Sequence, residues 1–204
     1  MITITLPSND KKQYDKPVTS AEIANDISEK LKSDALVSIV NGELWDLDRP
    51  IEVDSKIAIL TKKNRETLDV IRHDAAHIMA EAVLELFPET QVTIGPSIEN
   101  GFYYDFYREK KFILSDLEII EKRMHEIVDR DETISREVWS RENAIDHFKK
   151  NNEKFKLELL KAIPEDETVT FYRQGKFLDL CRGPHTCSTK KLGHSFKLTK
   201  LAGS

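Results

Sequence analysis

The sequence predicts an α+β protein in which a small unit, residues 1–62, precedes a larger one, residues 63–204. Three observations carry this prediction. Short strand patterns surround one helix pattern in the first ~60 residues, a long helix pattern follows, and a strand hairpin lies near the end. Charged residues make up 33% of the chain and hydrophobic residues 39%, which is typical of a globular protein and excludes a disordered one.

The first unit reads as strands around a single helix. Apolar and β-branched residues alternate over residues 2–6, turn residues follow, and residues 11–16 can return as a second strand. Thr19 or Ser20 can cap a helix over residues 21–31. Further strands are expected at residues 35–40, 43–47 and 56–60. This order predicts a β-grasp, ubiquitin-like module, and because it holds no cluster of nucleophiles, bases or ligands, we expect a binding role.

The second unit opens with a helix pattern from Thr67 to Leu86. Its apolar residues fall within a stripe roughly 80° wide, and these are Leu68, Ile71, Ala75, Ile78, Ala82 and Leu86. His73 and His77 lie on the far side of the helix, near Ala80 and Leu84. The helix therefore has two apolar faces, and we expect one to meet a core and the other to line a pocket.

The remaining elements of the second unit are shorter. Turns are expected at Gly95–Pro96 and Asn100–Gly101, followed by an aromatic strand in which Phe102, Tyr104 and Phe106 share one face. Ser115 and Glu118 form a capping-box pattern for a helix to about Arg130. Helices around residues 144–150 and 155–163 precede a hairpin that turns at Gln174–Gly175. The long helix is expected to pack on an antiparallel sheet.

Two short phrases carry the chemistry. "RHDAAH" places His73 and His77 four residues apart on a helix, close enough to share a ligand or a water. A zinc protease would have Glu where Asp74 stands, so that motif fails. "DLCRGPH" repeats the spacing with Cys181 and His185, and the four residues make a complete tetrahedral zinc set in type and number. Two interpretations stay open: the four bind a metal, or they surround a substrate and share protons with it.

The charge distribution and the lack of targeting signals limit the kinds of partner and the location that we expect. The net charge is −5, but residues 171–204 carry seven Lys or Arg against one acid, Asp179, which leaves −11 on the rest. A phosphate-rich partner near this stretch is one interpretation, and an ordinary solvated surface is the other. The sequence has no signal peptide and no apolar run of ~20 residues, so we expect a cytoplasmic protein without a membrane partner. Cys181 and Cys187 are not expected to form a disulfide.

The phrases "RHDAAH", "IGPSIENGFYYD", "EKRMHE" and "DLCRGPH", in this order, resemble the amino-terminal part of bacterial threonyl-tRNA synthetases. The resemblance covers the whole chain. It implies that residues 1–62 form a TGS domain and residues 63–204 an editing domain, which hydrolyses seryl-tRNA made in error. The resemblance further implies that the class II catalytic domain and the anticodon-binding domain of that family, with its sites for ATP and zinc, are not among these 204 residues.

The resemblance also implies site residues and partners. The editing pocket falls on His73, His77, Tyr104, Lys156, Asp179, Cys181 and His185. Within it, His73 and Lys156 are expected to handle protons, Asp179 to bind the α-ammonium of the substrate, and the others to bind or enclose it. No cofactor is expected for editing. The implied partner is tRNA(Thr) through its aminoacylated 3′ end, with a homodimer for the full-length protein and a monomer as an option for this chain.

Two other functions are compatible with the residues. A stand-alone zinc-dependent aminoacyl-tRNA hydrolase would use His73, His77, Cys181 and His185 as metal ligands. A non-enzymatic RNA-binding regulatory module would depend on the β-grasp unit instead. Metal content separates the first alternative from a metal-free hydrolase, and a deacylation assay separates the second.

Overall fold

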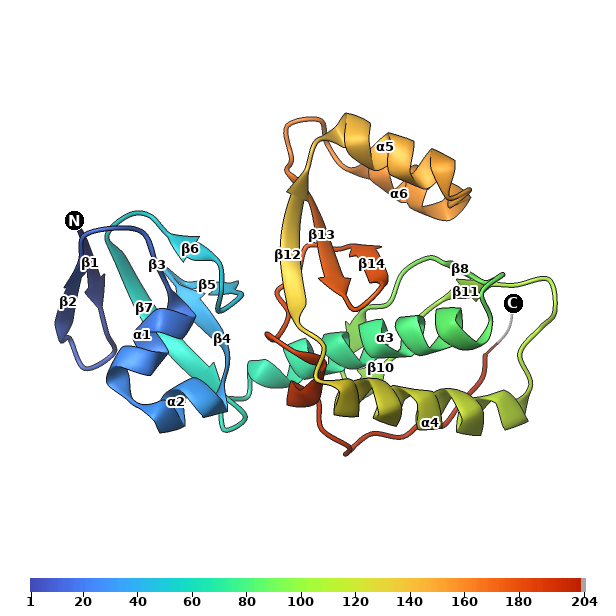
Figure 1. Cartoon of the computed structure of the whole chain (residues 1–204), viewed down its shortest axis with the longest axis horizontal. Helices are drawn as coiled ribbons and strands as arrows, with labels where there is room; N and C mark the ends of the chain where they lie inside the picture. The colour runs from blue at the N-terminus through green and yellow to red at the C-terminus, as the bar shows by residue number, and fades with distance from the viewer. Residues whose placement is uncertain (203–204) are drawn as a thin grey trace. The chain divides into compact units, whose positions relative to one another are not determined.

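The computed structural model describes residues 1–202, and its fold is α+β, as predicted (Figure 1). The contacts divide the chain into two compact units, which are described in turn: Met1–Ile71 with Gly183–Cys187, and Arg72–Arg182 with the residues from Ser188 onward. Among residues 1–202, no helix combines the length and the apolar character needed to cross a lipid bilayer.

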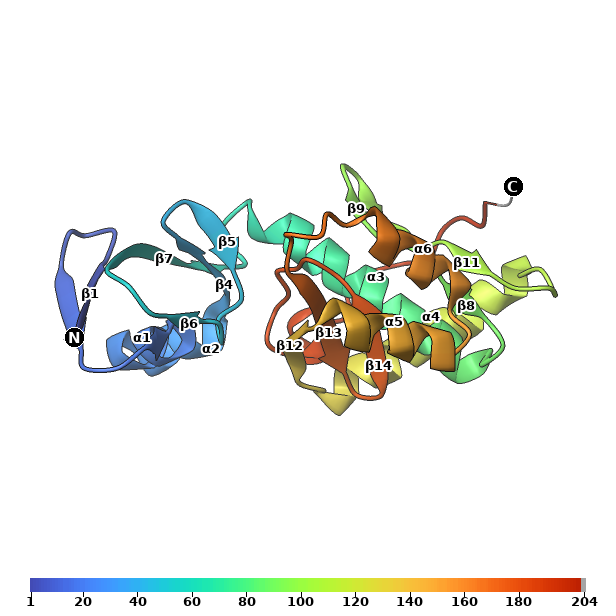
Figure 2. The ribbon, with the colours of Figure 1, turned by 90° about the horizontal axis from the view of Figure 1, so that it is seen from above.

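The first unit is a β-grasp fold. Its elements are β1 (Ile2–Thr5), β2 (Lys11–Tyr14), β3 (Val18–Thr19), α1 (Ser20–Ile27), α2 (Glu29–Asp34), β4 (Ala35–Val40), β5 (Glu43–Trp45), β6 (Pro50–Ile51) and β7 (Ser55–Thr61). The main sheet has the order β2-β1-β7-β4-β5, in which β1 and β7 run parallel and the other pairs antiparallel. Figure 2 shows α1 and α2 together on one face of this sheet. Ile4, Ile23 and Ile57 belong to the core cluster between them.

The helical segment of this unit differs from the prediction. Thr19 caps α1 as expected, because its hydroxyl accepts the N–H of Glu22 and the Glu22 carboxylate accepts the N–H of Thr19. The single helix predicted over residues 21–31 is wrong, since Ser28 divides it. The Ser28 N–H donates to Ala24 O and ends α1, while its hydroxyl accepts the N–H of Leu31 and starts α2.

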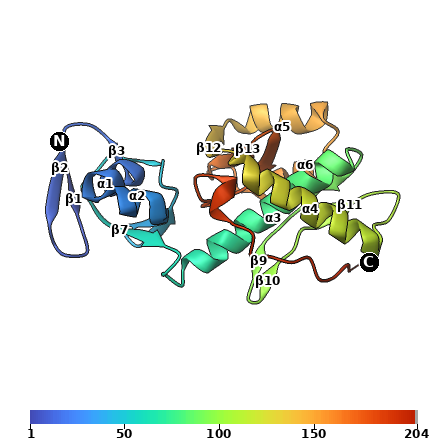
Figure 3. The same ribbon diagram turned by 60° about the horizontal axis from the view of Figure 1, so that its bottom comes forward.

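The second unit contains the long helix and several small sheets. Its elements are α3 (Thr67–Leu86), β8 (Gln91–Val92), β9 (Ser97–Ile98), β10 (Gly101–Phe102), β11 (Phe106–Tyr107), α4 (Leu114–Arg130), β12 (Ile134–Trp139), α5 (Arg141–Lys150), α6 (Lys154–Ala162), β13 (Val169–Gln174), β14 (Phe177–Leu180) and the 3-10 helix η1 (Thr189–Lys191). The antiparallel sheet β12-β13-β14 lies beside α3 and α4, and α5 pairs with α6 (Figures 1 and 3).

Both predicted apolar faces of α3 are present. Ala76 and Ala80 pack with Tyr104 and Phe177 in one cluster, so the face that carries the histidines meets the aromatic strand region and β14. The middle of the predicted core stripe is buried, at Ala75, Ile78 and Ala82, whereas its ends are partly buried or, at Leu68, exposed. The helix bounds match the prediction because a 20-residue apolar pattern dominates local alternatives.

Three local predictions in this unit had different outcomes. The capping box of Ser115 and Glu118 is wrong: α4 begins at Leu114, and the Asp116 carboxylate accepts the N–H of Ile113 at 2.9 Å instead. The aromatic strand is interrupted between β10 and β11, but its predicted faces are confirmed, since Tyr104 is buried and Tyr103 is exposed. The hairpin turn after Gln174 is also confirmed.

Candidate active site

The predicted site residues of the second unit come from four segments. His73 and His77 project from α3, and Asp179 and Cys181 stand on and just after β14. Tyr104 lies between β10 and β11, where Gly95 leaves room for it, since a Cβ there would overlap the tyrosine ring. The remaining residue, Lys156, lies in the first turn of α6.

The carboxylate of Asp179 is the centre of the polar contacts. Its Oδ2 accepts a hydrogen bond from the Tyr104 hydroxyl at 2.6 Å and lies 3.5 Å from Nε2 of His77. Its Oδ1 forms an ion pair with the ammonium of Lys156. Asp179 is 3% exposed and Lys156 is 2% exposed, so both charges are removed from bulk water. Their mutual pairing offsets part of the desolvation cost that each would carry alone.

Tyr104 completes this network as a hydrogen-bond donor. Lys156 Nζ donates to the Tyr104 hydroxyl at 3.2 Å, and that hydroxyl donates in turn to Asp179. Burial, followed by the adjacent Asp179 carboxylate, raises the pKa of Tyr104 well above its usual value. The phenol therefore keeps its proton and holds the carboxylate in one orientation.

Helix α6 is itself anchored, which fixes the backbone that carries Lys156. The guanidinium of Arg141 donates to the carbonyl oxygens of Leu160 at 2.8 Å, Ile163 at 3.0 Å and Pro164 at 2.6 Å. These carbonyls lie at and beyond the carboxyl end of the helix, where the regular helical hydrogen bonds run out and the Leu160 carbonyl accepts the backbone N–H of Ile163 at 3.3 Å. A cation suits this position because the helix dipole is negative there.

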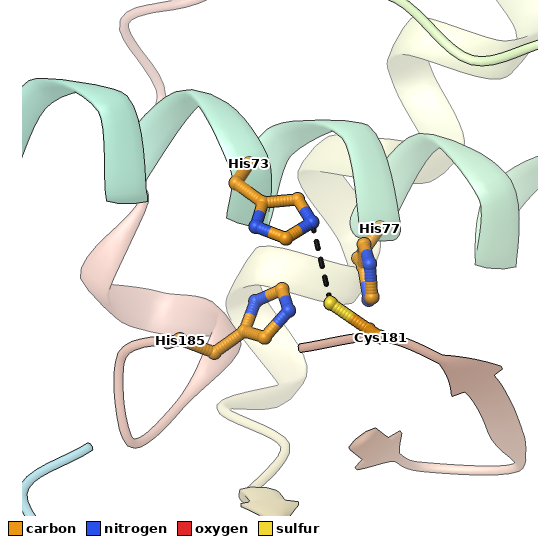
Figure 4. A group of neighbouring side chains, drawn as sticks. All are labelled: His73, His77, Cys181 and His185. Carbon is orange, nitrogen blue, oxygen red and sulfur yellow. Dashed lines mark hydrogen bonds between the residues drawn. The ribbon is translucent and has the colours of Figure 1, made fainter. Parts of the chain in front are cut away.

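The two histidines of α3 lie side by side, and a thiol faces one of them. Their ring centroids are 4.8 Å apart with the planes nearly perpendicular. Cys181 Sγ lies 3.5 Å from Nε2 of His73, as the dashed line in Figure 4 marks. His77 is buried, whereas His73 is partly exposed. His73 is thus the histidine of this pair that solvent water can reach.

The four candidate metal ligands lie close together. His73, His77, Cys181 and His185 each offer one ligand atom, and these atoms all lie within 4.8 Å of one another (Figure 4). Tetrahedral zinc with ligands at ~2.0–2.3 Å needs ligand atoms roughly 3.3–3.8 Å apart, so the set fits in type and number with a small contraction. The backbone N–H of His185 donates to Asp46 Oδ1 at 2.9 Å.

Sequence reasoning missed one ionisable group close to this network. Burial raises the pKa of Glu153 to about 7, the charge of Lys156 lowers it, and that of Asp179 raises it. Glu153 precedes α6, three residues before Lys156, and this spacing was the available signal. The other histidines have local partners: His125 pairs with His194 at 2.8 Å between Nδ1 atoms, and His147 packs edge-on against Trp139. Cys187 is not in a disulfide.

Comparison with protein families defines the class. Residues 2–61 match the family described as the TGS domain. Residues 169–204 match the "Threonyl and Alanyl tRNA synthetase second additional domain". The second match contains Asp179, Cys181 and His185. The chain thus joins a TGS domain to a region similar to the additional domain of two tRNA synthetase families.

Individual relatives are more specific. The chain is 52% identical over 204 residues to the threonine–tRNA ligase of Maricaulis maris, 54% to that of Phenylobacterium zucineum and 53% to that of Rickettsia akari. Each match covers all of this chain and 31–32% of the relative, so the chain spans about a third of the length of the curated relatives it matches. The predicted resemblance to threonyl-tRNA synthetases is confirmed along the whole sequence.

Proposed function

We propose that this chain is the proofreading part of a threonyl-tRNA synthetase, with a TGS domain in residues 1–62 and an editing domain in residues 63–204. In this proposal the editing domain hydrolyses the ester of mischarged seryl-tRNA(Thr). The observation that carries it is the buried group of Asp179, Lys156 and Tyr104 beside the His73–Cys181 pair. The similarity to threonine–tRNA ligases supports the choice of substrate.

A second site for serine has a physical reason. Serine is threonine without one methyl group, and a missing methyl changes binding by only about 1–3 kcal/mol. A synthetic site that fits threonine therefore cannot exclude serine well enough. A smaller hydrolytic pocket can admit serine and reject threonine by its extra methyl, so that the two sites together act as a double sieve.

The first step would place the amino group of the substrate at Asp179. The α-ammonium is a cation, and in the free protein the carboxylate is paired with the ammonium of Lys156 and held by the Tyr104 hydroxyl. An incoming ammonium competes with Lys156 for this carboxylate. Lys156 is then released toward the ester, where a cation stabilises the charge that develops on the carbonyl oxygen. Binding and activation are thereby coupled through one buried carboxylate.

The second step needs a base and an acid. His73, the more accessible histidine, would take the proton of the attacking water, and Lys156 would return a proton to the leaving ribose oxygen. The ester C–O bond breaks, and serine and tRNA are the products. His77, Cys181 and His185 would enclose the serine side chain or the terminal ribose.

The partners and location belong to the same proposal. The cationic residues 171–204 would contact tRNA phosphates near the aminoacylated 3′ end, which predicts weaker binding at higher salt. The name of the relatives, threonine–tRNA ligase, supports tRNA(Thr) as the partner. The proposal places the protein in the cytoplasm. Ligation of threonine to tRNA with ATP would belong to a longer protein of the relatives' length, for which the proposal includes a homodimer.

A deacylation assay tests the reaction. The purified 204-residue chain should release serine from seryl-tRNA(Thr), and His73→Ala should reduce the rate about 100-fold or more, because the general base is lost. His125→Ala is the matched control, since this histidine lies on α4 and pairs with His194. Bound seryl-tRNA that stays intact with the wild-type chain would instead favour the RNA-binding module.

A zinc-dependent hydrolase is the second candidate, favoured by the close approach of the four ligand atoms. His73, His77, Cys181 and His185 would hold the ion, which would supply a water of lowered pKa. Elemental analysis of the purified chain, with and without chelator, separates the two. A metal-free chain that is fully active supports the proton-transfer pair. One zinc per chain, with activity lost on chelation, supports the alternative.

A further inference from the structure

A second buried polar cluster lies on α3, one helical turn beyond His77. Its first member, Glu81, is 3% exposed, and its second, Gln174, is 1% exposed at the end of β13. The Nε2 of Gln174 donates a hydrogen bond to Glu81 Oε2 at 2.7 Å. This bond joins two segments 93 residues apart, and the proposed reaction uses neither side chain. A carboxyl group at such a depth needs a further partner or a proton.

The third member, the carboxyl group of Glu132, lies at the same end of the hairpin, next to the Gln174–Gly175 turn. It lies between α4 and β12, and its Oε2 is a buried atom without a conventional hydrogen-bond donor in residues 1–202. Its carboxylate lies against the hairpin turn, because a Cβ at Gly175 would come within 2.7 Å of Oε2. Its backbone is held as well: the Glu132 N–H donates to Thr189 Oγ1 at 3.0 Å, and the Thr189 N–H donates to Glu132 O.

The charged groups around this pair do not neutralise it. Arg130 binds Glu85 with two nitrogens, at 2.6 and 2.9 Å, and approaches the outer oxygen of Glu132 only at 3.5 Å. Arg123 also binds Glu85. Burial raises the pKa of Glu81 to about 8, the amide of Gln174 opposes this, and the carboxyls of Glu132 and Glu85 add to it. Two carboxylates can hydrogen bond to each other only when one of them carries a proton.

We propose that Glu81 and Glu132 share one proton, and that this proton fixes the β13–β14 hairpin, which carries Asp179, against α3. The protonated Glu81 donates to Glu132 Oε2 and accepts from Gln174, so the segment before β12 and the end of β13 are joined to the helix. Loss of the proton leaves the buried Glu81 carboxylate beside the partly buried Glu132 carboxylate, and their repulsion loosens the hairpin. The effect on hydrolysis rests on the proposed function, whereas the effect on the hairpin does not.

The sign of the pH dependence follows from the direction of the shift. A carboxyl whose pKa is raised from 4.5 in the unfolded chain to about 8 in the folded protein binds its proton more tightly when folded. Its contribution to stability is therefore complete below about pH 4.5 and is lost as the pH rises toward 8. Hairpin protection should decrease across this range, because the opened hairpin loses the proton at a lower pH than the closed one, and it should level off above about pH 8.

The test compares the wild-type chain with Glu81→Gln, which replaces the shared proton by a permanent amide donor. Carboxyl-carbon NMR should show Glu81 of the wild type titrating near pH 8. Amide hydrogen exchange in β13 and β14, corrected for the intrinsic rate, should accelerate about tenfold between pH 7 and pH 9, as for loss of one proton. Glu81→Gln should abolish this acceleration, and the exposed Glu109→Gln should leave it unchanged.

Glu132→Gln gives an independent check if the first variant fails to fold, because it places a donor on the other side of the pair. A wild-type Glu81 that titrates below pH 6, or exchange in the hairpin that responds to pH equally in wild type and variant, overturns the proposal. These readouts do not involve tRNA. A chain that shows the titration but leaves seryl-tRNA intact would retain the shared proton and lose only the proposed function.

Discussion

Residues 1–71 and residues 72–182 bury different kinds of polar side chain. The buried polar residues of the first range are all hydroxyl-bearing, namely Ser20, Ser38, Ser55 and Thr67. The second range buries ionisable groups, which are Asp74, His77, Glu81, Lys156 and Asp179. A buried hydroxyl is satisfied by one or two hydrogen bonds, whereas a buried charge needs an opposite charge or a proton. Residues 1–71 are therefore built as a scaffold, and residues 72–182 are built around groups that exchange charge; the buried His185 of the first unit lies outside both ranges.

The sharpest test of this contrast is Lys156→Met, which removes one charge of the buried pair and keeps an apolar stem. Asp179 is left uncompensated, so stability should fall by about 3–5 kcal/mol. In the proposed reaction, seryl-tRNA deacylation should fall by about 10²–10⁴-fold. Chemical denaturation and single-turnover deacylation measure the two effects. The exposed neighbour Lys154→Met is the matched control, and an equal loss in both variants would contradict the assignment.

In the β-grasp unit, the corresponding large effect should concern stability alone. Ile23 is fully buried in the core cluster that also contains Ile4, and Ile23→Ala should cost about 2–5 kcal/mol. Thermal unfolding measures the loss of stability, and amide hydrogen exchange in β1 and β7 shows whether the loss arises in this unit. Below the unfolding transition, the deacylation rate should stay within about twofold of wild type. A selective loss of hydrolysis with the unit still folded would show that the scaffold takes part in the reaction.

Glu153→Gln should produce a smaller, pH-dependent effect. Its folded-state pKa of about 7 lies above the usual value of 4.5, so its contribution to stability is complete at low pH and is lost as the pH rises toward 7. The variant should lack this decline while retaining the rest of the pH profile. Unfolding midpoints at pH 5, 6, 7 and 8 provide the measurement. Identical profiles for both proteins would contradict a pKa raised by burial of this carboxyl.

The smallest effect is expected at the surface of the β-grasp unit. The Tyr14 hydroxyl donates to Asp26 Oδ2 at 3.0 Å in an exposed position, and Tyr14→Phe should cost about 0.5 kcal/mol. Burial and Asp26 raise the pKa of Tyr14 to about 12, so the wild-type phenol should not ionise below pH 11 in an ultraviolet titration. A loss of stability as large as that of Ile23→Ala would contradict the prediction, because an exposed hydrogen bond would then contribute as much as a core side chain.

Features encoded by local patterns were predictable from the sequence. The bounds of α3, the Thr19 cap and the order of the main β-grasp elements along the chain follow from periodicity and turn residues within a few positions. The errors arose where a side chain competed with the backbone of its own segment. Ser28 ends α1 and starts α2, although the apolar pattern continues across it. Helix α4 begins at Leu114, where the Asp116 carboxylate accepts the N–H of Ile113, and the expected Ser115 cap is not used.

The site was predictable to a different extent in its different parts. The four-residue spacings of His73–His77 and Cys181–His185 indicated one cluster, and the four ligand atoms do lie together. Tyr104 and Lys156 came from the family resemblance, because alone each reads as an ordinary core or surface residue. The cluster of Glu81, Gln174 and Glu132 had no sequence signal, since its members lie far apart in the chain and meet only through the hairpin.

The measurement that tests the account most directly is the ratio of two deacylation rates. The 204-residue chain is mixed with seryl-tRNA(Thr) or threonyl-tRNA(Thr) at equal concentration, and release of the amino acid is followed at low salt. A pocket that rejects the extra methyl should hydrolyse the seryl ester at least about tenfold faster. Lys156→Met should remove this preference along with the activity. Equal rates for the two esters, or a preference that survives in Lys156→Met, would contradict an editing site built on the buried Asp179–Lys156 pair.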